Sequence, residues 1–132
     1  MLRLSVTADR VMIVEDDFET RELIAEVLRD DGYAVQTAAN GAEALATLRT
    51  VTDERPDIIL LDLMMPIMSG WQFLEERATD QDLARIPVLV LSADPSRQLA
   101  SSRGVVAVVG KPFDLPRLLK LVRAVTKAQP RS

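Results

Sequence analysis

Five short apolar runs recur along the chain, each ending in polar or turn residues and each followed by a segment of helical period. The runs are rich in Val, Ile and Leu without strict alternation, which is typical of parallel strands covered by helices on both faces. The pattern therefore predicts parallel strands, each interior or nearly so: Val11 to Val14, Ala34 to Ala38, Ile58 to Leu61, Val88 to Leu91 and Val105 to Val109.

The segments between these runs predict amphipathic helices. The first spans Glu19 to Asp30 and stops at Gly32, and Asn40 is a candidate N-cap of the second. The third runs from Trp71 to Thr79, and Asp114 caps the last. We expect their apolar faces to be buried: Leu23, Ile24, Val27 and Leu28; Ala44, Leu45 and Leu48; Trp71 and Leu74; Leu118, Leu119, Val122 and Val125.

Helices that alternate with parallel strands predict an α/β domain with a doubly wound sheet, whose ligand sites lie beyond the carboxyl ends of the strands. A length of 132 residues with 48% hydrophobic content fits one domain with an ordinary core. We expect residues 1–9 to be an N-terminal extension, residues 10–128 to be the domain, and residues 129–132 to be a short polar tail with no further domain after it.

The residue counts limit the possible metal ligands and the possible location of the protein. The chain has no Cys and no His, so thiolate and imidazole ligands are excluded and any metal must be bound by oxygen. The apolar runs are far shorter than the roughly 20 residues that span a bilayer, and Met1 to Arg10 lacks a signal-peptide core. We therefore expect a cytoplasmic protein without membrane contact.

The charge balance argues against direct nucleic-acid binding, because 20 acidic residues outnumber 16 basic ones for a net charge of −4. Basic residues do gather near the C-terminus. We interpret them as a solvated helix face with charges that complement the helix dipole: Arg117, Lys120, Arg123, Lys127 and Arg131.

Functional side chains stand at the ends of four of the five predicted strands: Glu15, Asp16 and Asp17; Asp62; Ser92; and Lys111. Because the carboxyl ends of parallel strands meet at one edge of the sheet, we expect them to converge. Carboxylates suit the hard cation Mg²⁺, and Asp16 and Asp62 are the candidate direct ligands. An aspartate can also attack phosphorus. Asp62 is the candidate nucleophile, because it is the one flanked on all sides by the other functional groups. Lys111 would supply positive charge and Ser92 a hydroxyl for phosphoryl oxygens.

Each motif alone has an ordinary structural interpretation. Acidic residues before a helix complement its dipole, Lys-Pro is a common turn, Ser92 can be a helix cap, and Met64 and Met65 can fill core gaps. The functional interpretation rests on the conjunction, since four groups of the required chemistry occur at four strand ends in one order.

These residues resemble the signature of the receiver domain of two-component response regulators, of the chemotaxis-regulator type, over about residues 10–128. The matching motifs are Val14-Glu15-Asp16-Asp17, Leu60-Leu61-Asp62-Leu63-Met64-Met65-Pro66 with Gly70, Leu91-Ser92-Ala93, and Lys111-Pro112-Phe113. The resemblance implies a flavodoxin-like three-layer sandwich with strand order 2-1-3-4-5. It also implies that Asp62 accepts a phosphoryl group from a histidine kinase or phosphotransfer protein with Mg²⁺, or with Mn²⁺ in its place.

The resemblance further implies a role for each matching residue and a cis bond at Lys111-Pro112. The roles are metal ligation by Glu15, Asp16, Asp62 and the main-chain carbonyl of Met64, phosphate pairing by Lys111, a switch hydroxyl at Ser92, and control of the phosphoryl lifetime by Met64 and Asp94.

Two features depart from the family pattern. Val108 occupies a position where many members carry Tyr or Phe, so no aromatic switch is available there. The segment from Ala93 to Gly104 is a few residues shorter than usual, and we expect its helix to be short or loosely formed. Both features bear on how phosphorylation would be relayed to the surface.

Two alternative functions stay open at this point. One is a pseudo-receiver, a scaffold that binds partners without phosphorylation. The other is a Mg²⁺-dependent phosphohydrolase, whose motif requires a second aspartate where this chain has Met64. We expect a signalling protein rather than an enzyme, a monomer or weak dimer that acts by protein contact. The chain can be a complete single-domain regulator or a receiver cut from a longer protein.

Overall fold

The computed structural model describes residues 9–50, 52–93 and 104–128, and their strands form one parallel sheet in the order β3-β2-β4-β5-β6. Counted along the chain this order is 2-1-3-4-5, as predicted. The strands are β2 (Arg10–Val14), β3 (Ala34–Ala38), β4 (Ile58–Asp62), β5 (Val88–Ser92) and β6 (Val105–Gly110). The helices are α1 (Phe18–Asp30), α2 (Gly41–Thr50), α3 (Gly70–Ala78), α4 (Gln81–Ala84) and α5 (Leu115–Ala128).

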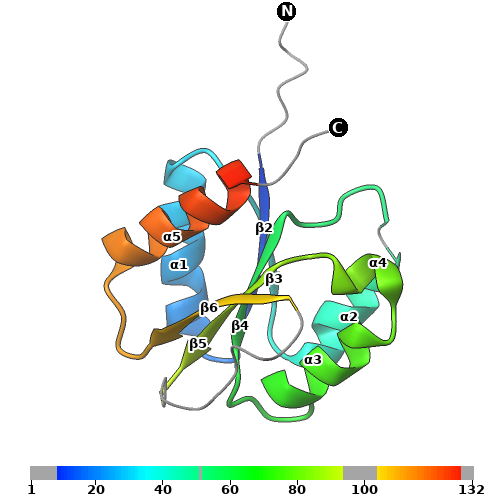
Figure 1. Cartoon of the computed structure of the whole chain (residues 1–132). Coiled ribbons are helices and arrows are strands. Elements are labelled where there is room, and N and C mark those ends of the chain that lie inside the picture. Colours follow the sequence, from blue (N-terminus) through cyan, green and yellow to red (C-terminus); the bar gives the residue numbers. More distant parts are fainter. Residues whose placement is uncertain (1–8, 51, 94–103, 129–132) are drawn as a thin grey trace, which may run out of the picture.

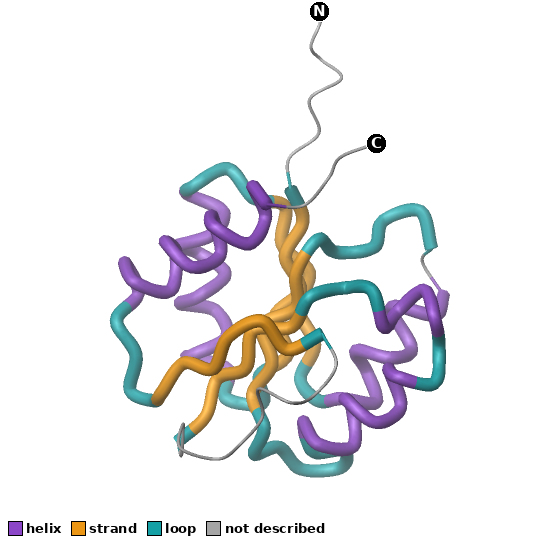
Figure 2. The backbone as a smooth tube through the Cα atoms, viewed as in Figure 1, coloured by secondary structure: helices purple, strands orange, loops and turns teal. Residues whose placement is uncertain are grey.

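The sheet lies between two helical layers, which confirms the predicted three-layer α/β sandwich. Helices α1 and α5 cover one face, and α2, α3 and α4 cover the other (Figure 1). The backbone trace in Figure 2 shows the strands in the centre, with helices to either side. Alternate residues of each strand serve opposite cores, so Val11 and Ile13 of β2 pack with Ile24 of α1, whereas Met12 and Val14 belong to the opposite cluster.

Local signals in the sequence fix the helix ends. The Asp17 side chain accepts a hydrogen bond from the Thr20 amide and caps α1, and Asn40 Oδ1 accepts one from the Glu43 amide at 2.9 Å, as predicted for the second helix. Gly32 follows α1 with a φ of 97°, which suits glycine. A capping box between Ser69 and Gln72 starts α3 and was not predicted.

Several expectations about burial are wrong. Strands β3 and β6 lie at the sheet edges and are mostly only partly buried, because each has a neighbour on one side only. Leu23, which was expected to be buried, is 52% exposed. Ala25, which was not predicted to be buried, belongs to the buried stripe of α1. The buried residues of α1 are Ile24, Ala25 and Leu28, so Leu23 lies outside the stripe that faces the sheet.

The α3–α4 region contains a buried charge that the hydrophobic pattern does not indicate. Arg77 is fully buried and donates to the main-chain oxygens of Ala84 at 3.0 Å and Ile86 at 2.5 Å, so its guanidinium ties α3 to the chain that enters β5. Burial lowers the pKa of Arg77. A Cβ on Gly104 would collide with this guanidinium, which explains why glycine stands where β6 begins.

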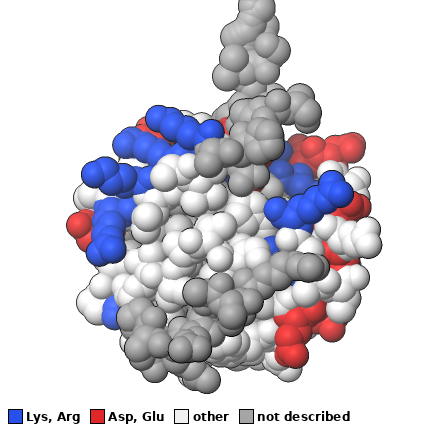
Figure 3. All heavy atoms as spheres, viewed as in Figure 1, with Lys and Arg blue, Asp and Glu red and all other residues white. Residues whose placement is uncertain are grey.

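Figure 3 shows a group of Lys and Arg side chains at the upper left, where α5 lies, and further basic side chains on the right. Arg117, Lys120 and Lys127 are exposed, as expected for a solvated face. Arg123 instead makes a two-bond ion pair with Asp31 at the end of α1, which joins the two helices on this face of the sheet.

No helix among the described residues is long and apolar enough to cross a membrane. The expected short helix between residues 93 and 104, the proposed role of Asp94, the N-terminal extension and the polar tail fall wholly or almost wholly outside the described residues. These expectations stay predictions.

Candidate functional site

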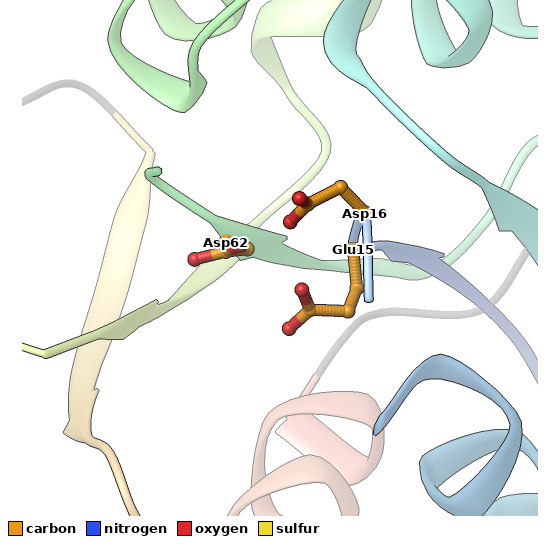
Figure 4. Close-up of side chains that lie close together, drawn as sticks. All are labelled: Glu15, Asp16 and Asp62. Carbon is orange, nitrogen blue, oxygen red and sulfur yellow. The ribbon is translucent and has the colours of Figure 1, made fainter. Parts of the chain in front are cut away.

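Three carboxylates meet at the carboxyl edge of the sheet. One oxygen from each of Glu15, Asp16 and Asp62 lies within 4.8 Å of the others. Figure 4 shows the three side chains close together, with Asp16 above and Glu15 below the level of Asp62. Pairing of Val14 with Leu61 brings the two strand ends level, so the residue after each pair carries an acid. Glu15 and Asp62 are buried, at 1% and 4% exposure, whereas Asp16 faces solvent.

Lys111 supplies the cation at this acidic edge. Its Nζ lies 2.9 Å from Glu15 Oε1 and 3.2 Å from Asp62 Oδ1. The Lys111 main-chain N–H donates to the Ser92 carbonyl at 2.8 Å, which holds the start of the β6–α5 connection against the end of β5. The Lys111-Pro112 peptide bond is cis, as the resemblance implies.

Burial and ion pairing set the electrostatics of the acidic pocket formed by Glu15, Asp62 and Lys111. Burial raises the pKa of Glu15 to about 7, with the charge of Asp62 adding to the effect, although hydrogen bonds from Lys111 and the Asp17 amide oppose it. Burial lowers the pKa of Lys111, but its hydrogen bond to Glu15 and the charge of Asp62 outweigh this and raise it overall. The pocket therefore keeps its lysine charged while one carboxyl holds its proton more tightly than usual.

The raised pKa of Glu15 predicts that the metal-free protein loses stability as the pH rises from about 4.5 through about 7. The folded state binds this proton more tightly than the unfolded chain, so the stabilisation is complete below 4.5 and disappears above 7. The loss would be at most on the order of 3 kcal/mol. Urea unfolding in EDTA at several pH values, compared with Glu15→Gln, measures it. A difference between the two proteins that stays constant with pH would contradict the assignment.

The carboxylate set fits a hard divalent cation. Mg²⁺ binds oxygens at about 2.0–2.1 Å, so two ligand oxygens on one ion lie up to about 4.2 Å apart. The observed spread of at most 4.8 Å requires only small side-chain rotations to reach that geometry. Three clustered carboxylates and one lysine also leave negative charge for a cation to offset.

The β4–α3 loop packs closely on Asp62. The Met64 main-chain N–H donates to Asp62 Oδ1 at 3.3 Å, and the Gly70 N–H donates to the Leu63 carbonyl at 2.9 Å. A Cβ on Gly70 would lie 2.6 Å from the main-chain oxygen of Asp62, so only glycine fits this approach. The Met64 side chain is 72% exposed at the rim, which excludes the core-filling interpretation for it.

Ser92 and Val108 lie within one residue of their predicted places in the sheet. Ser92 is the last residue of β5, one place beyond Leu91, the partner of Asp62, and it is 5% exposed. Asp62 and Ser92 both end their strands rather than follow them, a difference of one residue from the prediction. Val108 pairs with Val90 and is partly buried against the core on the α2–α3 face.

Sequence reasoning missed Arg21, whose guanidinium Nη1 donates to the main-chain carbonyl of Glu15 at 2.8 Å. The available signal was its position four residues after Asp17. That spacing places Arg21 on the same side of α1 as the turn formed by Glu15, Asp16 and Asp17, which we call the acidic turn.

The family model of the response regulator receiver domain matches residues 11–123. The transcriptional regulatory protein PrrA of Mycobacterium bovis is 39% identical over 126 residues, which cover 92% of this chain and 52% of PrrA. The response regulator MprA of a Mycobacterium species is 36% identical over 122 residues, 89% of this chain and 50% of MprA. The chain thus spans about half the length of these relatives.

Solved structures agree with the sequence relatives. The chemotaxis response regulator CheY4 of Vibrio cholerae superposes with a TM-score of 0.80 at 32% identity, covering 90% of this chain and 99% of CheY4. The response regulator TrrA of Thermotoga maritima, in complex with Mg²⁺-BeF, gives a TM-score of 0.72 at 31% identity over 89% and 98% of the two chains. With the fold, the acidic edge and the family match together, this chain belongs to the response regulator receiver domain family of two-component signalling.

Proposed function

We propose that Asp62 accepts a phosphoryl group from a phosphohistidine of a histidine kinase or phosphotransfer protein, in a pocket that binds Mg²⁺. The observation that carries this proposal is the setting of Asp62. Its buried carboxylate lies 3.2 Å from the Lys111 ammonium and within 4.8 Å of two further carboxylates, at the edge where ligands of doubly wound sheets bind.

The chemistry follows from these positions. A carboxylate oxygen of Asp62 attacks phosphorus, the bond from phosphorus to the donor imidazole nitrogen breaks, and that nitrogen keeps the electron pair. Lys111 then pairs with a phosphoryl oxygen where it now pairs with Asp62. The hydroxyl of Ser92, at the end of the adjacent strand, donates to another phosphoryl oxygen.

Glu15, Asp16 and Asp62 would hold the Mg²⁺ ion, and the main-chain carbonyl of Met64 completes the proposed protein ligands. When bound, the ion neutralises charge on the phosphoryl oxygens and on the clustered acids. The Mg²⁺-BeF complex of TrrA, which is 31% identical to this chain, supports the choice of metal, and Mn²⁺ would substitute as another cation that prefers oxygen ligands.

The surface beside the acidic edge is largely apolar and open to a partner protein. Phe18 and Leu23 of α1 are 64% and 52% exposed, and a pocket of about 470 Å³ lies between α1 and the β6–α5 connection. Leu23, Ile24 and Phe113 contribute its apolar lining, and Lys111 links it to the acidic edge. We propose that the phosphodonor protein docks here, since its phosphohistidine must reach Asp62.

Incubation with acetyl phosphate and Mg²⁺, followed by intact mass measurement, tests the function. We expect one added phosphoryl group that is stable in acid, labile in base, not formed when EDTA is present from the start, and absent from Asp62→Asn. Asp17→Asn is a matched control, because Asp17 is an exposed aspartate in the same acidic turn that caps α1.

The same experiment, with an activity assay on unrelated phosphate esters added, separates the alternatives. A pseudo-receiver would gain no phosphoryl group under any of these conditions, and that result would overturn the proposal. Steady turnover of unrelated phosphate esters would instead identify a phosphohydrolase. Retention of the adduct in Asp62→Asn would place the acceptor at another residue.

A further inference from the structure

We propose that Arg21 is a positioning residue of the metal site, which fixes the main chain of the acidic turn and thereby aims Asp16. This inference rests on the proposed binding of Mg²⁺ by Glu15, Asp16 and Asp62. Arg21 is not itself a ligand of the cation. It would act through the peptide group that joins Glu15 to Asp16.

The contacts of Arg21 define that role. Its Nη1 donates to the Glu15 main-chain oxygen at 2.8 Å. Its guanidinium carbon lies 5.4 Å from the centre of the Phe18 ring, so the side chain is braced on the surface of α1 by a cation–π contact. The Arg21 main-chain N–H donates to the Asp17 carbonyl at 2.9 Å in the first turn of the helix, which anchors the same residue at its other end.

The acidic turn is otherwise held by hydrogen bonds that the main-chain N–H groups of Glu15 and Asp17 donate. The Glu15 N–H donates to the Ala38 carbonyl at 3.1 Å, and the Asp17 N–H donates to Glu15 Oε2 at 3.1 Å. Arg21 satisfies the carbonyl between them. With these groups fixed, the peptide plane before Asp16 has one orientation, which restricts the directions that the Cα–Cβ bond of Asp16 can take.

Asp16 depends on this support more than its neighbours do. Glu15 and Asp62 are buried and contact Lys111, whereas Asp16 is exposed on the solvent side of the cluster. An exposed carboxylate retains rotational freedom, so a fixed main chain lowers the entropy that a cation must remove on binding.

A positioning role and a purely electrostatic role of Arg21 predict opposite changes in Mg²⁺ affinity when Arg21 is replaced. Arg21 brings positive charge to an acidic turn, so if its charge dominated, its removal would tighten Mg²⁺ binding. If positioning dominates, its removal weakens binding. We expect Arg21→Met to weaken Mg²⁺ affinity about threefold to tenfold, the ratio that corresponds to one lost hydrogen bond. Arg21→Lys, which keeps a donor and the charge, should recover most of the affinity.

The experiment is a titration of the full chain with MgCl₂ followed by NMR amide shifts, together with hydrogen exchange of the Asp17 amide in the metal-free protein. Arg29→Met, which removes the same charge at the other end of α1, is the matched control and should change neither readout. We expect faster Asp17 exchange in Arg21→Met before any metal is added. Phe18→Leu should show a smaller effect in the same direction.

The outcomes distinguish this inference from the proposed function. Unchanged or tighter Mg²⁺ binding in Arg21→Met, with binding intact in the wild type, would overturn the positioning role alone. Equal Asp17 exchange in the two metal-free proteins would overturn it as well. Absence of Mg²⁺ binding in the wild type would overturn the proposed function itself.

Discussion

Replacing Lys111 with methionine is expected to slow phosphorylation by acetyl phosphate about 100-fold or more, because it removes the cation that meets the phosphoryl oxygens. In the wild type, Lys111 contacts both Glu15 and Asp62. No other described basic side chain makes an ion pair with either acid. The rate is measured from the growth of the phosphorylated mass with time at fixed Mg²⁺.

The same substitution should destabilise the metal-free protein by about 2 kcal/mol, since two buried carboxylates lose their counterion. We place the loss below the cost of a fully buried pair because the Lys111 side chain is 27% exposed. Lys120→Met is the matched control, as Lys120 is an exposed lysine on α5. A phosphorylation rate in Lys111→Met within about threefold of the control would contradict the role of Lys111.

Replacing Gly70 with alanine should cost about 2 to 3 kcal/mol of unfolding free energy and also reduce phosphorylation. The new Cβ would lie 2.6 Å from the Asp62 carbonyl oxygen and 2.7 Å from Leu63 Cα, and both are main-chain atoms that cannot rotate away. The loop must then lift from β4, and the Asp62 main chain must move with it. Urea unfolding and acetyl phosphate kinetics measure the two effects.

Gly32→Ala provides the comparison for Gly70→Ala. Gly32 has a φ of 97° but nothing within 4 Å of a Cβ, so it should lose only about 1 kcal/mol from backbone strain. Its phosphorylation rate should match the wild type. If Gly70→Ala behaved like Gly32→Ala in both measurements, the close approach of the β4–α3 loop to Asp62 would matter neither for stability nor for phosphorylation.

The sequence predicts most of the fold because buried parallel strands leave a strong pattern. The apolar runs ending at Val14 and Leu61 place both strands to within one residue, and strand order follows from the family resemblance. Convergence of Glu15, Asp62 and Lys111 also follows, because parallel strands bring their carboxyl ends to one edge.

What the sequence does not predict depends on contacts between distant segments. Periodicity marks Leu23 as apolar but does not show that the stripe of α1 facing the sheet passes through Ile24, Ala25 and Leu28 instead. Arg77 is hydrophilic by composition, and its burial depends on main-chain carbonyls at Ala84 and Ile86 that only the folded chain brings near. The capping box between Ser69 and Gln72 is the exception, because it is local and its Ser-x-x-Gln spacing could have predicted it.

The central claim is that Asp62 itself carries the phosphoryl group, and the most direct measurement is reductive trapping. Borohydride converts an aspartyl phosphate into homoserine, and peptide mass spectrometry then locates the modified residue. After treatment with acetyl phosphate and Mg²⁺, we predict homoserine at position 62 and unmodified aspartate at positions 16 and 17. Homoserine at position 16 or 17, or a phosphorylated protein that yields no homoserine, would contradict the account.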